Sequence, residues 1–114
     1  MSMIIYLAKK EKGVASMLAE GVTNEIIKNK VLKLIDQYPI QKISLFGSRA
    51  AGTNREDSDV DLIMEFSTPI SILTLSQIRC ELEDEIGLPV DLIHGPIRGD
   101  DMIEVGQVVE LYAA

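Results

Sequence analysis

Two apolar runs joined by a glycine-bounded turn constrain the fold of this chain more than any other part of its sequence. The first run covers residues 42–46 and leads into a turn bounded by Gly47 and Gly52. The second run, residues 59–66, opens with Asp59-Val60-Asp61 and is otherwise mostly apolar. Successive side chains of a strand point to opposite faces, so Asp59 and Asp61 share one face. The sequence therefore predicts two strands, the second of which begins with a pair of carboxylates.

A carboxylate pair at the start of an apolar strand needs a positive partner. Two like charges about 4 Å apart repel by about 4 kcal/mol at an effective dielectric constant near 20. Arg49 or Arg55 could supply the positive charge, and a divalent metal ion is the stronger candidate, because Mg²⁺ prefers one or two carboxylates together with phosphate oxygens and water. Residues 48–51 are predicted to begin a short helix after Gly47, and the free N–H groups of a helix start attract anions. The stretch therefore predicts a phosphate site facing a metal site.

A third acid could complete this site. Asp91 lies in a short apolar run, residues 90–93, which is predicted to form a third strand. If this strand pairs beside residues 60–65, Asp91 joins Asp59 and Asp61. Three carboxylates around a phosphate-bound metal suit nucleotidyl or phosphoryl displacement, in which metal ions stabilise the attacking and leaving oxygens.

Two other motifs are excluded by spacing. Asp57-x-Asp59-x-Asp61 matches the opening of an EF-hand loop, but Leu62 stands where that loop needs glycine and Thr68 where it needs glutamate. The segment from Gly47 to Gly52 matches the front of a phosphate-binding Walker loop, yet Thr53 stands where the lysine must be.

Two amphipathic helices are predicted around these strands. The first runs from Asn24, the predicted N-cap, to Pro39, and the second starts at Thr68 or Ser71 and ends at Gly87. The residues expected on the buried sides are Ile27, Val31, Leu34, Ile35 and Tyr38 in the first helix and Ile72, Leu75, Ile78, Leu82 and Ile86 in the second.

The ends of the chain carry weaker patterns. Residues 4–7 fit a strand or a helix start, residues 14–18 a short helix, residues 101–107 a final short helix, and residues 108–112 a segment along the sheet or a docked tail.

Composition limits the class of protein. The chain has 114 residues with 46% hydrophobic content, which suits one domain, residues 1–114, with one core. A net charge of −7 argues against direct nucleic-acid binding, which depends on neutralising phosphates with lysine and arginine. The single Cys80 fits a reducing compartment, and no apolar stretch approaches the about 18 residues of a membrane span. We therefore expect a soluble, cytoplasmic protein.

The central motifs resemble those of a known superfamily. Gly47-Ser48-Arg49-Ala50-Ala51-Gly52, followed by Ser58-Asp59-Val60-Asp61-Leu62 and later by Pro89-Val90-Asp91-Leu92, resembles the pattern of DNA polymerase beta-like nucleotidyltransferases. The short length is similar to that of minimal nucleotidyltransferases (MNT), which are commonly antitoxin partners of HEPN-domain toxins. The resemblance covers residues 24–112 and leaves residues 1–22 as an N-terminal extension. It implies an α/β (α+β) fold, with a small mixed sheet of three or four strands flanked by helices.

The resemblance also implies a role for each motif residue. Gly47 and Ser48 would contact the β- and γ-phosphates of ATP, and Arg49 would contact phosphate or a partner. Asp59, Asp61 and Asp91 would hold two Mg²⁺ ions, and Asp91 would also help to deprotonate the acceptor hydroxyl.

Three functions fit these expectations. The chain would transfer AMP from ATP to a hydroxyl of a HEPN toxin and so act as an antitoxin. Alternatively, it would neutralise the toxin by binding alone, or it would be a nucleotidyltransferase acting on a small molecule. The intact set of three acids favours an enzyme, and a homo-oligomer is compatible with the sequence.

Overall fold

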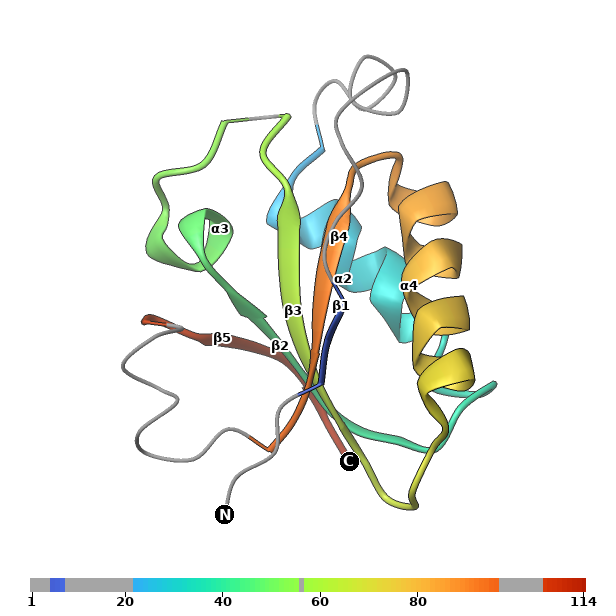
Figure 1. Ribbon diagram of the computed structural model, residues 1–114. Helices are drawn as coiled ribbons and strands as arrows, with labels where there is room; N and C mark the ends of the chain where they lie inside the picture. Colours follow the sequence, from blue (N-terminus) through green and yellow to red (C-terminus); the bar gives the residue numbers. More distant parts are fainter. Residues whose placement is uncertain (1–4, 8–21, 56, 97–105) are drawn as a thin grey trace.

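A computed structural model describes residues 5–7, 22–55, 57–96 and 106–114 (Figure 1). The elements are β1 (Ile5–Leu7), α2 (Asn24–Leu32), β2 (Ile40–Phe46), α3 (Ser48–Ala51), β3 (Val60–Phe66), α4 (Ile72–Ile86), β4 (Val90–His94) and β5 (Val109–Ala113). The helix expected at residues 14–18 and most of the one expected at residues 101–107 lie outside the described residues, and residues 106 and 107 are not helical.

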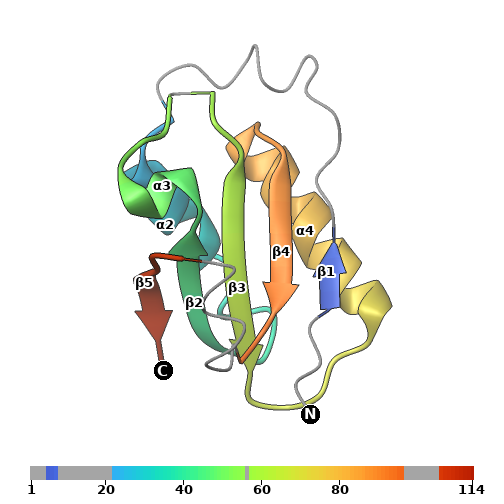
Figure 2. The same ribbon diagram turned by 60° about the vertical axis from the view of Figure 1, so that its left-hand side comes forward.

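The strands form one mixed sheet in the order β1-β4-β3-β2-β5 (Figure 2). Only the β3–β4 pair is parallel among these pairings, and the others are antiparallel. The predicted α/β class is confirmed. Of the two alternatives for residues 108–112, the segment along the sheet is confirmed, because most of these residues form strand β5. The sheet has one strand more than the upper expectation of four, because the N-terminal segment adds β1 to the edge of β4.

Helices α2 and α4 lie on the same face of the sheet (Figure 1). Val60, Leu62 and Met64 alternate along β3 and are fully buried in the core that these helices cover. The predicted apolar sides of the two helices are confirmed apart from Ile72, which is 53% exposed because it lies in the first turn of α4, where the helix has only begun to pack. Within the described ranges, no helix is long and apolar enough to cross a bilayer.

The ends of the helices follow local chemistry. Ser71 caps α4 by accepting a hydrogen bond from the N–H of Thr74, and Gly87 ends it in the left-handed conformation with φ 82°, as predicted. The N-cap of α2 was predicted wrongly. It is Thr23, whose side chain accepts from the N–H of Ile26 at 3.2 Å, and α2 ends at Leu32 rather than near Pro39.

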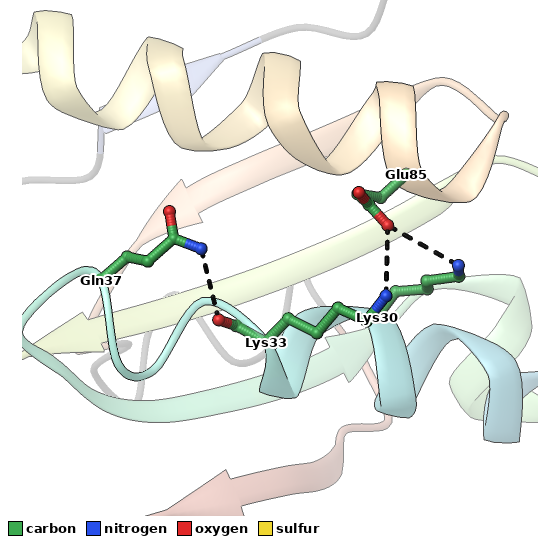
Figure 3. Close-up of polar contacts among 4 residues, drawn as sticks. All are labelled: Lys30, Lys33, Gln37 and Glu85. Carbon is green, nitrogen blue, oxygen red and sulfur yellow. Dashed lines mark hydrogen bonds and ion pairs between the residues drawn. The ribbon is translucent and has the colours of Figure 1, made fainter.

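Polar contacts join α2 and its following turn to α4 (Figure 3). Lys30 and Lys33 each place Nζ 3.6 Å from Glu85 Oε2. Beyond α2, Tyr38 donates a hydrogen bond to Glu81 at 2.9 Å. The two ion pairs are partly exposed, so each adds little stability, and the buried stripes supply most of the packing energy.

Candidate active site

The parallel pairing of β3 with β4 brings two of the predicted acids together. Asp61 lies directly opposite Asp91 in the register of the two strands. Their neighbours Leu62 and Leu92 belong to the helix-covered core, so both carboxylates point to the other face of the sheet. The side chain of Asp91 is only 2% exposed, whereas Asp61 is half-buried. The strand pairing on which the prediction for Asp91 depended is therefore present.

Asp59 precedes the first residue of β3 and is half-buried. Its place two residues before Asp61 keeps it at the same end of the strand. The metal-binding roles of all three acids stay predictions at this point.

Gly47 lies against the carboxylate of Asp61. The antiparallel register places Phe46 opposite Asp61, so the next residue along the chain begins the turn beside that acid. The backbone of Gly47 has φ 73° and ψ −152°, a region that almost only glycine adopts. A Cβ atom built on Gly47 would collide with Oδ2 of Asp61 and lie 3.2 Å from its Cγ. Glycine is therefore required for the backbone conformation and for the close approach of Asp61.

The rest of the turn is a single helical turn. Ala50 and Ala51 each donate a backbone hydrogen bond to the carbonyl of Gly47 at 3.1 Å. Gly52 ends α3 with φ 77°, and a Cβ there would meet nothing within 4 Å, so this glycine serves the backbone conformation of the turn. Ser48, the first residue of α3, is thereby held at the end of β2 beside Asp61. Its predicted contact with phosphate stays a prediction.

Arg49 does not occupy the exposed position that a phosphate or partner contact requires. Its side chain is 2% exposed. The guanidinium donates from Nε and Nη2 to the carbonyl of Ser58 at 3.2 and 3.0 Å, and from Nη1 to the carbonyl of Val22 at 3.3 Å. Arg49 therefore joins α3 to the loop before β3 and to the segment before α2. A four-residue helix has no periodicity from which this burial could be predicted.

The charge of Arg49 acts on the acidic cluster. Burial lowers the pKa of the guanidinium from its ordinary value, and the neighbouring carboxylates act in the opposite direction. The carboxylates with this effect are, in decreasing order, Asp59, Asp57 and Asp61. The structure thus favours the alternative in which Arg49 is a positive partner of the acids.

The donor set fits a magnesium ion that shares its coordination with a bound substrate. In the described part of the chain, no three carboxylate, imidazole or thiol groups are already arranged to hold a metal ion. Asp61 and Asp91 are nevertheless opposite one another, and Mg²⁺ needs only one or two carboxylates when phosphate oxygens and water complete its octahedron. Because Gly47 has no side chain, the carboxylate of Asp61 can lie directly against the turn that is predicted to bind phosphate.

The chain is similar to known proteins in sequence and in fold. The family model described as polymerase beta, nucleotidyltransferase, matches residues 29–105. A Methanocaldococcus jannaschii protein named "putative protein adenylyltransferase" is 34% identical over 67 residues, which are 59% of this chain and 72% of that protein.

Two solved structures share the fold. A chain of a toxin–antitoxin structure with AMP-PNP has a TM-score of 0.61 and 23% identity, with 76% of this chain and 73% of that chain covered. A chain from the structure of a tri-AMPylated Shewanella oneidensis HEPN toxin in complex with an MNT antitoxin has a TM-score of 0.62 and 21% identity, with 81% and 74% covered.

Proposed function

Since this chain belongs to the polymerase beta nucleotidyltransferase family, we propose that it transfers AMP from ATP to a hydroxyl group of a HEPN-type toxin partner in the cytoplasm and so acts as an antitoxin. The observation that carries the proposal is the pairing of Asp61 with Asp91 on one face of the sheet, beside the turn at Gly47. The adenylyltransferase name of the relative and the AMPylated toxin in the similar complex support this choice of reaction and partner.

In the proposed reaction, each of these groups has one role. The acceptor hydroxyl oxygen attacks the α-phosphorus of ATP, the bond from that phosphorus to the bridging oxygen breaks, and pyrophosphate leaves. Asp91, which is 2% exposed and lies opposite Asp61, accepts the hydroxyl proton. Gly47 and Ser48 bind the β- and γ-phosphates through the turn.

Bound magnesium ions would neutralise the negative charge of the triphosphate. Asp59 and Asp61 would hold them together with Asp91. The chain's own contribution is to fix Asp61 and Asp91 on two adjacent strands, with Asp59 just before β3, so that few conformations are lost when substrate arrives.

The proposal is tested with purified protein, Mg²⁺, ATP labelled at the α-phosphate, and the HEPN-type protein proposed as the partner. We expect label to move to the HEPN protein. The variants Asp59→Asn and Asp61→Asn should reduce labelling to background, whereas Asp84→Asn, at an exposed position of α4, should label like the wild type. Equal labelling by the wild type and the Asp59→Asn/Asp61→Asn double variant would refute the catalytic assignment.

A second measurement separates chemistry from binding. If the double variant still neutralises the toxin in growing cells and still forms the complex, the antitoxin acts by binding alone. If neutralisation disappears while the complex remains, AMP transfer is the mechanism.

A further inference from the structure

We propose that Glu83 is a positioning residue for Asp91, because its carboxylate fixes the backbone at the start of β4. This inference rests on the proposed function, in which Asp91 is part of the active site. Glu83 lies on α4, on the helix-covered face, and does not itself reach the acids.

The contact between Glu83 and β4 is direct. The backbone N–H of Val90 donates a hydrogen bond to Glu83 Oε2 at 3.0 Å. Helix α4 ends at Gly87, and the chain returns to the sheet within three residues. A side chain one turn before the helix end thus accepts from the first residue of the next strand.

The N–H of Val90 needs this acceptor because of the sheet's topology. On the β3 side, Val60 donates its N–H to the carbonyl of Pro89, so the N–H of the next residue, Val90, points away from β3. On the other side, the described pairs between β4 and β1 join Leu92, Ile93 and His94 to residues 5–7, so the acceptor that the structure describes for the N–H of Val90 is Glu83. Val90 is buried, and a buried N–H without an acceptor is destabilising. The carboxylate of Glu83 supplies that acceptor.

A second residue of α4 holds Glu83 in place. Arg79, four residues earlier, has Nη1 3.4 Å from Glu83 Oε2, and the two side chains are only 12% and 11% exposed. An ion pair between two largely covered side chains restricts the rotamers of the glutamate. The direction of the hydrogen bond from Val90 is consequently fixed.

The consequence falls on Asp91, the next residue along β4. Its carboxylate points to the opposite face from the core and lies beside Asp61. A displacement of the Val90 backbone would be passed directly to Asp91, and misplacement of a reacting group by about 1 Å can cost about a hundredfold in rate.

The test uses three substitutions at Glu83 and a control at the adjacent residue. Glu83→Ala removes the acceptor, Glu83→Asp keeps the charge but shortens the reach to Val90, and Glu83→Gln keeps an acceptor oxygen at the same reach. Asp84→Ala, at the adjacent exposed position, controls for loss of an acid from this end of α4. Glu83→Asp keeps the experiment informative if Glu83→Ala does not fold.

Three readouts are compared: hydrogen exchange of the Val90 amide by NMR, Mg²⁺ affinity in the presence of AMP-PNP by calorimetry, and kcat of AMP transfer. We expect Glu83→Ala and Glu83→Asp to accelerate Val90 exchange, to weaken Mg²⁺ binding and to lower kcat by about tenfold or more, with little change in KM for ATP. Glu83→Gln should recover most of each loss, and Asp84→Ala should match the wild type.

The inference is overturned if Val90 exchange accelerates in Glu83→Asp while Mg²⁺ affinity and kcat stay within about threefold of the wild type. It is also overturned if Glu83→Gln behaves like Glu83→Asp, because the hydrogen bond would then not be the relevant contact. Absence of AMP transfer by the wild type would instead refute the proposed function, and the exchange and Mg²⁺ measurements would still decide the role of Glu83.

Discussion

Replacement of Gly47 by alanine tests the link between the turn and the acidic pair. The new methyl group would occupy the space now taken by Oδ2 of Asp61, and the backbone at φ 73° and ψ −152° would be strained. We therefore expect Gly47→Ala to lower both stability and AMP transfer.

The structure allows the size of the effect to be divided into two parts. A non-glycine residue in this backbone region costs about 2 kcal/mol. Displacement of the Asp61 carboxylate adds about 1 kcal/mol, within the usual range for coupled neighbouring residues. For a domain of this size 1 kcal/mol corresponds to a shift in Tm of about 4 °C, so we expect Tm to fall by about 12 °C.

The assay is thermal unfolding followed by circular dichroism, with AMP transfer measured at a temperature where every variant is folded. Gly52→Ala is the matched control, because Gly52 also has a positive φ, 77°, but its Cβ would meet nothing within 4 Å. The Gly52→Ala variant should lose about 1 kcal/mol of its free energy of unfolding through backbone strain alone. Its AMP transfer should equal that of the wild type.

A double-mutant cycle isolates the contact with Asp61. In an Asp61→Ala background the methyl group no longer meets a carboxylate, so the cost of Gly47→Ala should fall from about 3 to about 2 kcal/mol. The turn does not position Asp61 if two results are found together. The first is that Gly47→Ala lowers the free energy of unfolding equally in the wild-type and Asp61→Ala backgrounds. The second is that Gly47→Ala and Gly52→Ala have equal effects on AMP transfer.

Two further predictions concern buried polar contacts. Arg49→Lys should destabilise the fold by about 2 kcal/mol in urea unfolding, because a single ammonium nitrogen does not reproduce the separate guanidinium nitrogens that donate to the carbonyls of Ser58 and Val22. A change below about 0.5 kcal/mol would contradict this role. Tyr38→Phe should cost about 1 kcal/mol at neutral pH by removing the hydrogen bond to Glu81. The pKa of Tyr38 is raised above its ordinary 10.0, first by burial and then by the hydrogen bond to Glu81 and the charge of Glu81. The contribution of Tyr38 to the free energy of unfolding is therefore present in full below pH 10 and is lost as pH rises through the raised pKa. The difference in stability between the wild type and Tyr38→Phe should therefore shrink above pH 10, and a constant difference would contradict the assignment.

The predictions that succeeded depended on local patterns. The apolar stripe of α4, its cap at Ser71 and its end at Gly87 follow from spacing and from the few residues that tolerate those backbone conformations. The prediction of Asn24 as the cap of α2 was wrong, because Thr23, one residue earlier, is also a good cap residue and takes that position. Asn24 instead donates its side-chain amide to the carbonyl of Arg49, a contact that depends on the fold.

The sequence by itself determined the central strands, the span of α4 and the glycine turn, because each depends on neighbouring residues. Only the tertiary structure decided that Asp91, thirty residues later, lies opposite Asp61, that Arg49 is buried, and that β1 joins the edge of the sheet. These outcomes depend on which strands pair and in what register, and strand pairing is set by packing of the whole core rather than by any short segment.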